Sequence, residues 1–146
     1  LFVDSYRKLA ELQEPVLVEI PLAAFVERIR TLYPDLEWHI SIPLSATMFT
    51  DENMLRQVLI NLVKNACEAG ATAMDVRWNK ELWISNNGAP IPADVEREIF
   101  VPFFTTKKNG SGIGLSLSRQ MMVRQGRDLC LAERPVPGFQ VTFIVS

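Results

Sequence analysis

The chain has 146 residues, which is the length of a single domain. Hydrophobic residues make up 48% of the chain and charged residues 22%, a balance that supports a packed core and argues against disorder. The formal net charge is -2, whereas a general nucleic-acid binder or a polybasic membrane binder would carry an excess of basic residues. No apolar run approaches the roughly 20 residues of a membrane span.

The ends and the cysteines of the chain add two expectations. The sequence begins with Leu1 rather than Met, and we therefore expect a piece of a longer protein. Cys67 and Cys130 form neither a Cys-x-x-Cys pair nor a Cys/His cluster. We expect both to be free, buried thiols of a reducing compartment.

The first half of the chain predicts alternating strands and helices. Apolar residues about one helical turn apart in residues 1–12 predict the end of a helix, stopped before Pro15. Thr50 or Asp51 is expected to cap a long helix that ends near Ala69, with Gly70 as its stop. The segments expected between these two helices are a strand over Val16–Ile20, a helix beginning at Pro21, a strand over Leu36–Ile42 and a short strand over Ala46–Phe49.

The second half predicts further hairpins, and therefore an α+β two-layer sandwich. Its expected elements are paired strands over Ala73–Trp78 and Leu82–Ser85, a short acidic helix over Ala93–Ile99, a helix over residues 113–124, and strands over Leu129–Ala132 and Phe139–Val145.

A stripe of amides borders the apolar face of the long helix. Asn61 and Asn65 lie four residues apart and therefore stack on one side, with Glu68 following on the same stripe. Asparagine is a mediocre residue for a helix interior, because its side chain competes for backbone hydrogen bonds. One interpretation is a satisfied polar rim. The other is a metal or phosphate site, since an amide oxygen is a hard ligand suited to Mg²⁺.

A glycine-rich segment, residues 109–115, opens the helix predicted after it. Its glycines allow close backbone approach to a ligand, and the helix start favours an anion. The preceding residues, 105–108, add two hydroxyls and two ammonium groups. The alternative is a surface loop with a solvated charge pair.

Taken in order, four motifs resemble the catalytic, ATP-binding domain of bacterial sensor histidine kinases, in the superfamily of DNA gyrase, Hsp90 and MutL. The sequence Asn61-Leu62-Val63-Lys64-Asn65-Ala66 looks like the N box, and Asn86-Asn87-Gly88-Ala89-Pro90 looks like the first glycine box. Residues 100–107 look like the F box, and residues 110–115 look like the second glycine box. The similarity covers about residues 16–145.

The resemblance implies the Bergerat fold, a mixed sheet covered by three helices on one face, over residues 15–146. Residues 1–14 would then be the end of a preceding dimerisation and phosphoacceptor helix with its linker. The cofactors that it implies are ATP and Mg²⁺.

Site residues are also carried over from the resemblance by position. Asn65 would ligate Mg²⁺, and Asn61 would line the phosphate site beside it. Asn86 would face the adenine amino group, and Gly88 would let the backbone pass close to the base. The catalytic residues would be Asn61, Asn65 and Lys107. The further nucleotide-binding residues would be Lys64, Ile91, Phe104, Thr105, Thr106, Gly110, Ser111, Gly112, Ile113, Gly114 and Leu115.

Three departures from the family pattern bear on these roles. Asn86 replaces the usual Asp, so ATP is expected to remain preferred but with weaker discrimination against GTP. Pro90 replaces a glycine and fixes φ at about -65°. Residues 125–127, Gln-Gly-Arg, replace a common His-Gly-Gly, with an expected effect on structure alone.

The resemblance further implies a function in two-component signal transduction. ATP-hydrolysing relatives have a Glu where this chain has Asn61, an amide that cannot take a proton, and this favours phosphate transfer to a protein nucleophile. The expected acceptor is a histidine of the dimerisation domain, since His39 lies on the polar face of a predicted strand. Expected partners are that domain and a response regulator receiver domain, with no nucleic acid.

The longer protein is expected to be a homodimer anchored in the bacterial inner membrane, with this domain in the cytoplasm. Two alternatives remain open at this point. One is a serine-directed kinase of the anti-sigma type, and the other is a nucleotide-binding pseudokinase, which Asn86 and Pro90 motivate.

Overall fold

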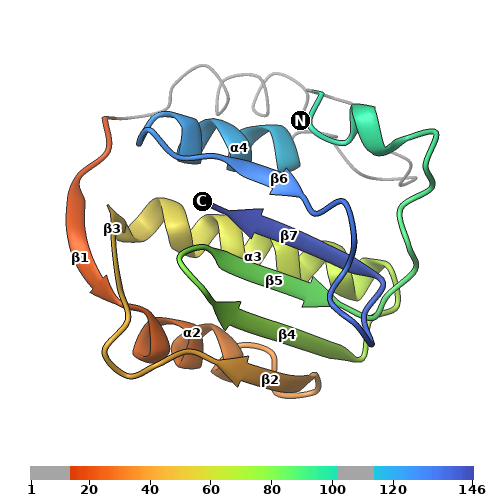
Figure 1. Ribbon diagram of the computed structural model, residues 1–146, viewed down its shortest axis with the longest axis horizontal. Coiled ribbons are helices and arrows are strands. Elements are labelled where there is room, and N and C mark those ends of the chain that lie inside the picture. The colour runs from red at the N-terminus through yellow and green to blue at the C-terminus, as the bar shows by residue number, and fades with distance from the viewer. Residues whose placement is uncertain (1–13, 102–113) are drawn as a thin grey trace.

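The computed structural model describes residues 14–101 and 114–146 (Figure 1). The helix predicted over residues 1–12, and with it the division of the chain near residue 14, lies outside these ranges. The helices of the described part are α2 (Leu22–Thr31), α3 (Glu52–Glu68), α4 (Gly114–Val123) and the 3-10 turn η1 (Glu96–Glu98). The strands are β1 (Leu17–Pro21), β2 (Glu37–Ser41), β3 (Thr47–Asp51), β4 (Ala73–Trp78), β5 (Leu82–Asn86), β6 (Leu129–Leu131) and β7 (Val141–Val145).

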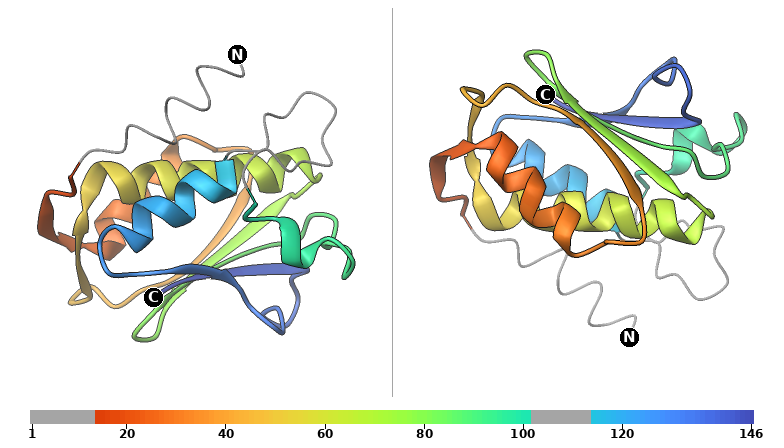
Figure 2. Two further views of the ribbon diagram at one scale, coloured as in Figure 1. Left: turned by 90° about the horizontal axis from the view of Figure 1, so that it is seen from above. Right: turned by 90° about the horizontal axis from the view of Figure 1, so that it is seen from below.

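The described strands form two sheets. The larger sheet has the order β2-β4-β5-β7-β6, in which β2 and β4 are parallel and the other pairs antiparallel. Strands β1 and β3 form a separate antiparallel pair. Figure 2 shows α2, α3 and α4 on one side of the larger sheet. The expected α+β sandwich with a mixed sheet and three helices is therefore confirmed.

The core lies between this sheet and the three helices. Helix α3 is its centre, because seven of its side chains are buried in the i, i+3, i+4 pattern of an amphipathic helix. Strands β5 and β7 contribute alternate residues, among them Leu82, Ile84 and Phe143. Leu55, Leu62 and Leu82 are among the largest fully buried side chains. At about 1.5–3 kcal/mol for each such side chain, this burial is the main force that holds α3 on the sheet.

Helix α3 begins and ends where the sequence predicts. The Asp51 side chain caps it by accepting a hydrogen bond from Met54 N at 2.9 Å, and its other oxygen accepts from Val16 N at 2.8 Å. At the other end, Gly70 has φ +83°, a left-handed conformation that glycine adopts without strain. The amide of Ala71 then donates to Ala66 O at 2.9 Å and closes the last turn.

Two predictions are wrong in detail. The segment Ala93–Ile99 forms only the single turn η1, because seven residues supply too few hydrogen bonds to offset the cost of helix nucleation. The cysteines are free but not buried: Cys67 is exposed and Cys130 is partly covered. Cys67 follows the buried Ala66 and is rotated about 100° from it, which takes it off the apolar face. Partial burial, together with the charges of Asp128 and Glu81, raises the pKa of the Cys130 thiol.

The chain's one histidine, His39, is a surface residue, as predicted. It lies on β2, where its Nε2 is 2.8 Å from Glu37 Oε2 and its ring is edge-on to Phe139. Over residues 14–101 and 114–146, none of the helices is both long and apolar enough to cross a membrane.

Candidate functional site

The beginning of α4 touches the stripe of amides on α3. A Cβ atom built on Gly114 would lie 2.6 Å from Asn61 Oδ1, closer than such atoms approach, so any larger residue would displace the amide. One turn further along α4, the buried Ser118 accepts a hydrogen bond from Asn61 Nδ2 at 3.2 Å. This bond leaves Oδ1, the acceptor end of the amide, beside the first residue of α4.

Asn65 lies one turn beyond Asn61 on the same side of α3. Both amides are half-buried, as expected for a stripe that borders the apolar face, while Lys64 is exposed. In the part of the chain that the structure describes, no group of three His, Cys, Asp or Glu side chains comes together to hold a metal ion. A cation here would therefore rely on amide oxygens and on the oxygens of a bound anion. This donor set fits Mg²⁺, which proteins commonly hold through one or two side chains and substrate phosphates.

The loop after β5 packs on the carboxyl end of α3. A Cβ atom on Gly88 would lie 3.0 Å from Ala69 Cβ and 3.1 Å from Ala69 O, which is tighter than nine in ten real Cβ contacts, so Ala69 would have to move by a few tenths of an ångström. The next residue, Ala89, donates its N–H to Ala69 O at 2.9 Å. Asn86 is 5% exposed, and its Oδ1 accepts from Gly88 N at 2.9 Å. Both glycine boxes therefore meet the same helix, about two turns apart.

Asn87 fixes the position of this loop from the outside. Its Oδ1 accepts hydrogen bonds from the backbone amides of Thr72 and Ala73, at 2.8 and 2.9 Å. Its Nδ2 donates to the Thr72 hydroxyl at 2.8 Å. Beyond the loop, the half-buried Ile91 packs against the core.

An aromatic and charged cluster holds the residue at the start of the F box. The Phe100 ring is edge-on to Phe143 of β7 at 6.4 Å. The Arg119 guanidinium of α4 lies 5.2 Å from the Phe100 centroid, within the range of a cation–π contact. Arg119 also pairs with Asp128 at 3.0 Å. Phe100 is thereby tied to both α4 and the sheet.

The structure describes eight of the sequence-predicted site residues. Asn61, Lys64 and Asn65 lie on α3; Asn86, Gly88 and Ile91 lie at or after the end of β5; and Gly114 and Leu115 begin α4. Of these, Asn61 and Gly114 are in direct contact, as are Asn86 and Gly88. The other predicted residues lie outside the described ranges: Phe104, Thr105, Thr106, Lys107, Gly110, Ser111, Gly112 and Ile113.

Two residues of the site were not anticipated from the sequence. Ser118 orients the Asn61 amide, and Ala69 supports Gly88. Helical spacing could have indicated Ser118, because it lies four residues after Gly114 and therefore on the same face of α4. No sequence signal marks Ala69.

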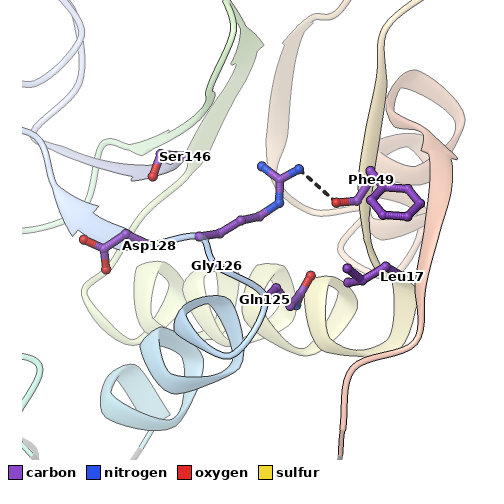
Figure 3. Close-up of a pocket in the computed structure, with 7 residues that line it drawn as sticks. Leu17, Phe49, Gln125, Gly126, Asp128 and Ser146 are labelled. Atoms are coloured by element: carbon purple, nitrogen blue, oxygen red, sulfur yellow. Dashed lines mark hydrogen bonds between the residues drawn. The ribbon is translucent and has the colours of Figure 1, made fainter.

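A separate cavity of about 470 Å³ lies at the other end of α4, roughly 15 Å of helix away from Gly114 (Figure 3). Arg127 lines it and donates to Phe49 O at 2.9 Å. Gln125 also lines it, and its Oε1 accepts from the Thr50 hydroxyl and from Asp51 N. Its Nε2 donates to Met121 O at 3.1 Å. These contacts join the end of α4 to the start of α3.

Comparison with known proteins agrees with this arrangement. Residues 50–146 match the family described as histidine kinase-, DNA gyrase B- and HSP90-like ATPases. The chain therefore belongs to this family of ATPase domains, and its similar relatives within it are sensor histidine kinases.

Among those relatives, the signal transduction histidine-protein kinase AtoS of Escherichia coli is 35% identical over 101 residues, covering 64% of this chain and 16% of that protein. The sensor protein kinase PilS of Pseudomonas aeruginosa is 26% identical over 98% of this chain and 31% of that protein. Among solved structures, the catalytic domain of histidine kinase ThkA has a TM-score of 0.74 and 28% identity, covering 89% of this chain and 93% of that one. The chain thus spans less than a third of these two full-length relatives.

Proposed function

We propose that this chain binds Mg-ATP and presents the γ-phosphoryl group to a histidine of a dimerisation domain in the longer protein. One observation carries the proposal: α3 and its C-cap contact one residue of each glycine box, Asn61 at Gly114 and Ala69 at Gly88, with Asn65 midway between them. A triphosphate nucleotide needs a site for its base and a site for its phosphates, and we assign these two sites to the two contacts, which lie about two turns apart along α3 and its C-cap. The names of the sensor kinases to which the chain is similar support the same reaction.

The described residues would act by positioning and by charge neutralisation. Asn65 would hold Mg²⁺, which supplies positive charge against the phosphates. The Asn61 amide, oriented by Ser118, would present its oxygen at the same place. The N-terminus of α4 at Gly114 directs the positive end of its helix dipole toward this side of α3. Lys107, outside the described residues, would add a cationic group.

Transfer rather than hydrolysis follows from the chemistry of Asn61. A neutral amide cannot accept a proton from water, whereas a carboxylate at this position could. In the proposed reaction a nitrogen of the acceptor imidazole forms a bond to the γ-phosphorus, as the bond to the oxygen that bridges to the β-phosphate breaks. The product would be a phosphohistidine and ADP.

For the longer protein we propose a homodimeric sensor kinase of a bacterial two-component system, anchored in the inner membrane, that passes phosphate to a response regulator receiver domain. The sensor kinase names of the relatives support this class. The upstream sequence tests it. A His followed by an acidic residue on a predicted helix would support the class, and a helical region without such a pair would contradict it.

Titration of Mg-ATP into the purified chain tests the binding function. Because Asn65→Ala would remove the proposed metal ligand from a half-buried position, we expect it to weaken Mg-ATP binding about tenfold or more while the chain still folds. The matched control is Asn53→Ala, an exposed residue two turns before Asn61 on α3, which should bind like the parent. Equal affinities for parent and Asn65→Ala would refute the assignment.

A further inference from the structure

Asn86 lies where the sheet faces the end of α3. It ends β5 and shares one face of that strand with Leu82 and Ile84, which are both core residues. In the sheet it is flanked by Met74 of β4 and Val141 of β7. Two residues later, Gly88 packs against Ala69, the C-cap residue of α3. The Asn86 side chain therefore belongs to the layer between sheet and helices, at the end where the base is proposed to bind.

The backbone decides which way the Asn86 amide faces. Gly88 N–H lies 2.9 Å from one end of the amide, and a donor at this distance requires an oxygen there. That end is therefore Oδ1, and the other is Nδ2. Reversing the amide would set two N–H groups against each other and leave a buried backbone donor unpaired, which opposes the flip.

An aspartate at this position would behave differently. One of its oxygens could accept from Gly88 N–H, and the second would remain an acceptor. Asn86 instead has an NH₂ group there, which can only donate. The purines differ at position six in the same property. Adenine has an amino group there that donates, whereas guanine and hypoxanthine have a carbonyl that accepts.

We propose that the Asn86 NH₂ group donates a hydrogen bond to position six of the bound purine. The site would then accept six-oxo purine nucleotides, which an aspartate at this position would disfavour. The inference rests on the proposed function and deepens it, since it concerns the base for which the same site is selective.

The test compares Mg-ADP, Mg-IDP and Mg-GDP by isothermal titration on the parent chain and on Asn86→Asp. The hypoxanthine of IDP carries the position-six carbonyl without guanine's second amino group, so the ADP-to-IDP affinity ratio isolates the contact. We expect Asn86→Asp to raise this ratio about tenfold, because it exchanges a donor for a charged acceptor. The parent should bind IDP at least as tightly as ADP, because the fixed donor of Asn86 would face an acceptor in hypoxanthine and another donor in adenine.

Asn87→Asp is the matched control. It adds the same charge one residue away and keeps the oxygen that accepts from Thr72 and Ala73, while the Thr72 hydroxyl, which now accepts from Asn87 Nδ2, can donate to the new oxygen instead. Its ADP-to-IDP ratio should equal that of the parent, which separates base recognition from a general effect of charge on the phosphates.

The outcomes are distinguishable. A rise in the ratio of threefold or more that is specific to Asn86→Asp supports the inference. A smaller rise, or an equal one in Asn87→Asp, overturns it and leaves the nucleotide site in place, with Oδ1 serving adenine through its second lone pair. Should Asn86→Asp not fold, the parent alone decides: ADP bound more than threefold tighter than IDP overturns the inference, and a lower ratio supports it. Failure of the parent to bind any of the three nucleotides would refute the proposed function itself.

Discussion

At the scale of single residues, the contact between Gly114 and Asn61 is the tightest constraint in the described site. A methyl group at position 114 would meet three atoms of the Asn61 amide at 2.6 to 3.1 Å. We expect Gly114→Ala to destabilise the chain by about 1–3 kcal/mol, the usual cost of overpacking. The same change should weaken Mg-ATP binding, because the amide or α4 must move. Urea unfolding and nucleotide titration measure the two effects.

Asn61→Ala supplies the control for this prediction, because it removes the atoms that Gly114→Ala would strike. In the Asn61→Ala background, Gly114→Ala should cost much less stability, giving a clear coupling energy in the double-mutant cycle. Strictly additive effects would mean that the two residues do not constrain each other.

Sequence reasoning identified the amides but not their orientation. The four-residue spacing of Asn61 and Asn65 predicted a half-buried stripe, because helical geometry depends only on position along the chain. The direction of the Asn86 amide depends on a backbone N–H two residues later, in a loop whose path no periodic pattern encodes. The partner of Asn61 on α4 likewise required the packing of two helices.

At the scale of elements, one side chain joins α4 to the beginning of α3. Gln125 accepts from the fully buried Thr50 hydroxyl and from Asp51 N, and donates to Met121 O. Gln125→Leu keeps the approximate volume but removes every hydrogen bond. We expect a loss of about 2 kcal/mol or more, because buried donors are left without acceptors. Denaturant unfolding measures the change.

Gln120→Leu is the control for Gln125→Leu, since Gln120 is an exposed residue of the same helix. It should alter the free energy of unfolding by less than about 0.5 kcal/mol. A similar loss in the two variants would show that the hydrogen bonds of Gln125 contribute nothing specific.

Elements with a long apolar period were predicted well, whereas short helical segments and the pairing of strands were predicted less well. Helix α3 was predicted almost to its ends, because its apolar period, Asp51 and Gly70 agree. The prediction of a helix over Ala93–Ile99 was wrong, because the composition of the segment favours a helix but its seven residues are too few to form one. The parallel pairing of β2 with β4 was not predicted, because alternation within a strand indicates its faces but not its neighbour.

At the scale of the whole molecule, the proposed function would divide the work between the two layers, with the base recognised by one and the phosphates positioned by the other. The sheet contributes Asn86 at the end of β5, and the helices contribute Asn61, Asn65 and Gly114. The site therefore depends on how the layers are stacked, and only the resemblance across four motifs could connect such distant residues from sequence. The only histidine lies on β2, and its contacts are with Glu37 and Phe139 rather than with these residues.

From this arrangement we expect the purified chain to bind Mg-ATP but to release almost no phosphate. The Asn61 amide cannot activate water, and the proposed acceptor histidine belongs to another domain. Asn61→Glu should raise phosphate release, since a carboxylate at position 61 could accept both a proton from water and a hydrogen bond from Ser118. A phosphate assay under saturating Mg-ATP measures this release. Adding Asn65→Ala should remove whatever activity appears, which excludes a contaminating ATPase. Rapid turnover by the unmodified chain that Asn65→Ala abolishes would contradict phosphotransfer and establish a hydrolase instead.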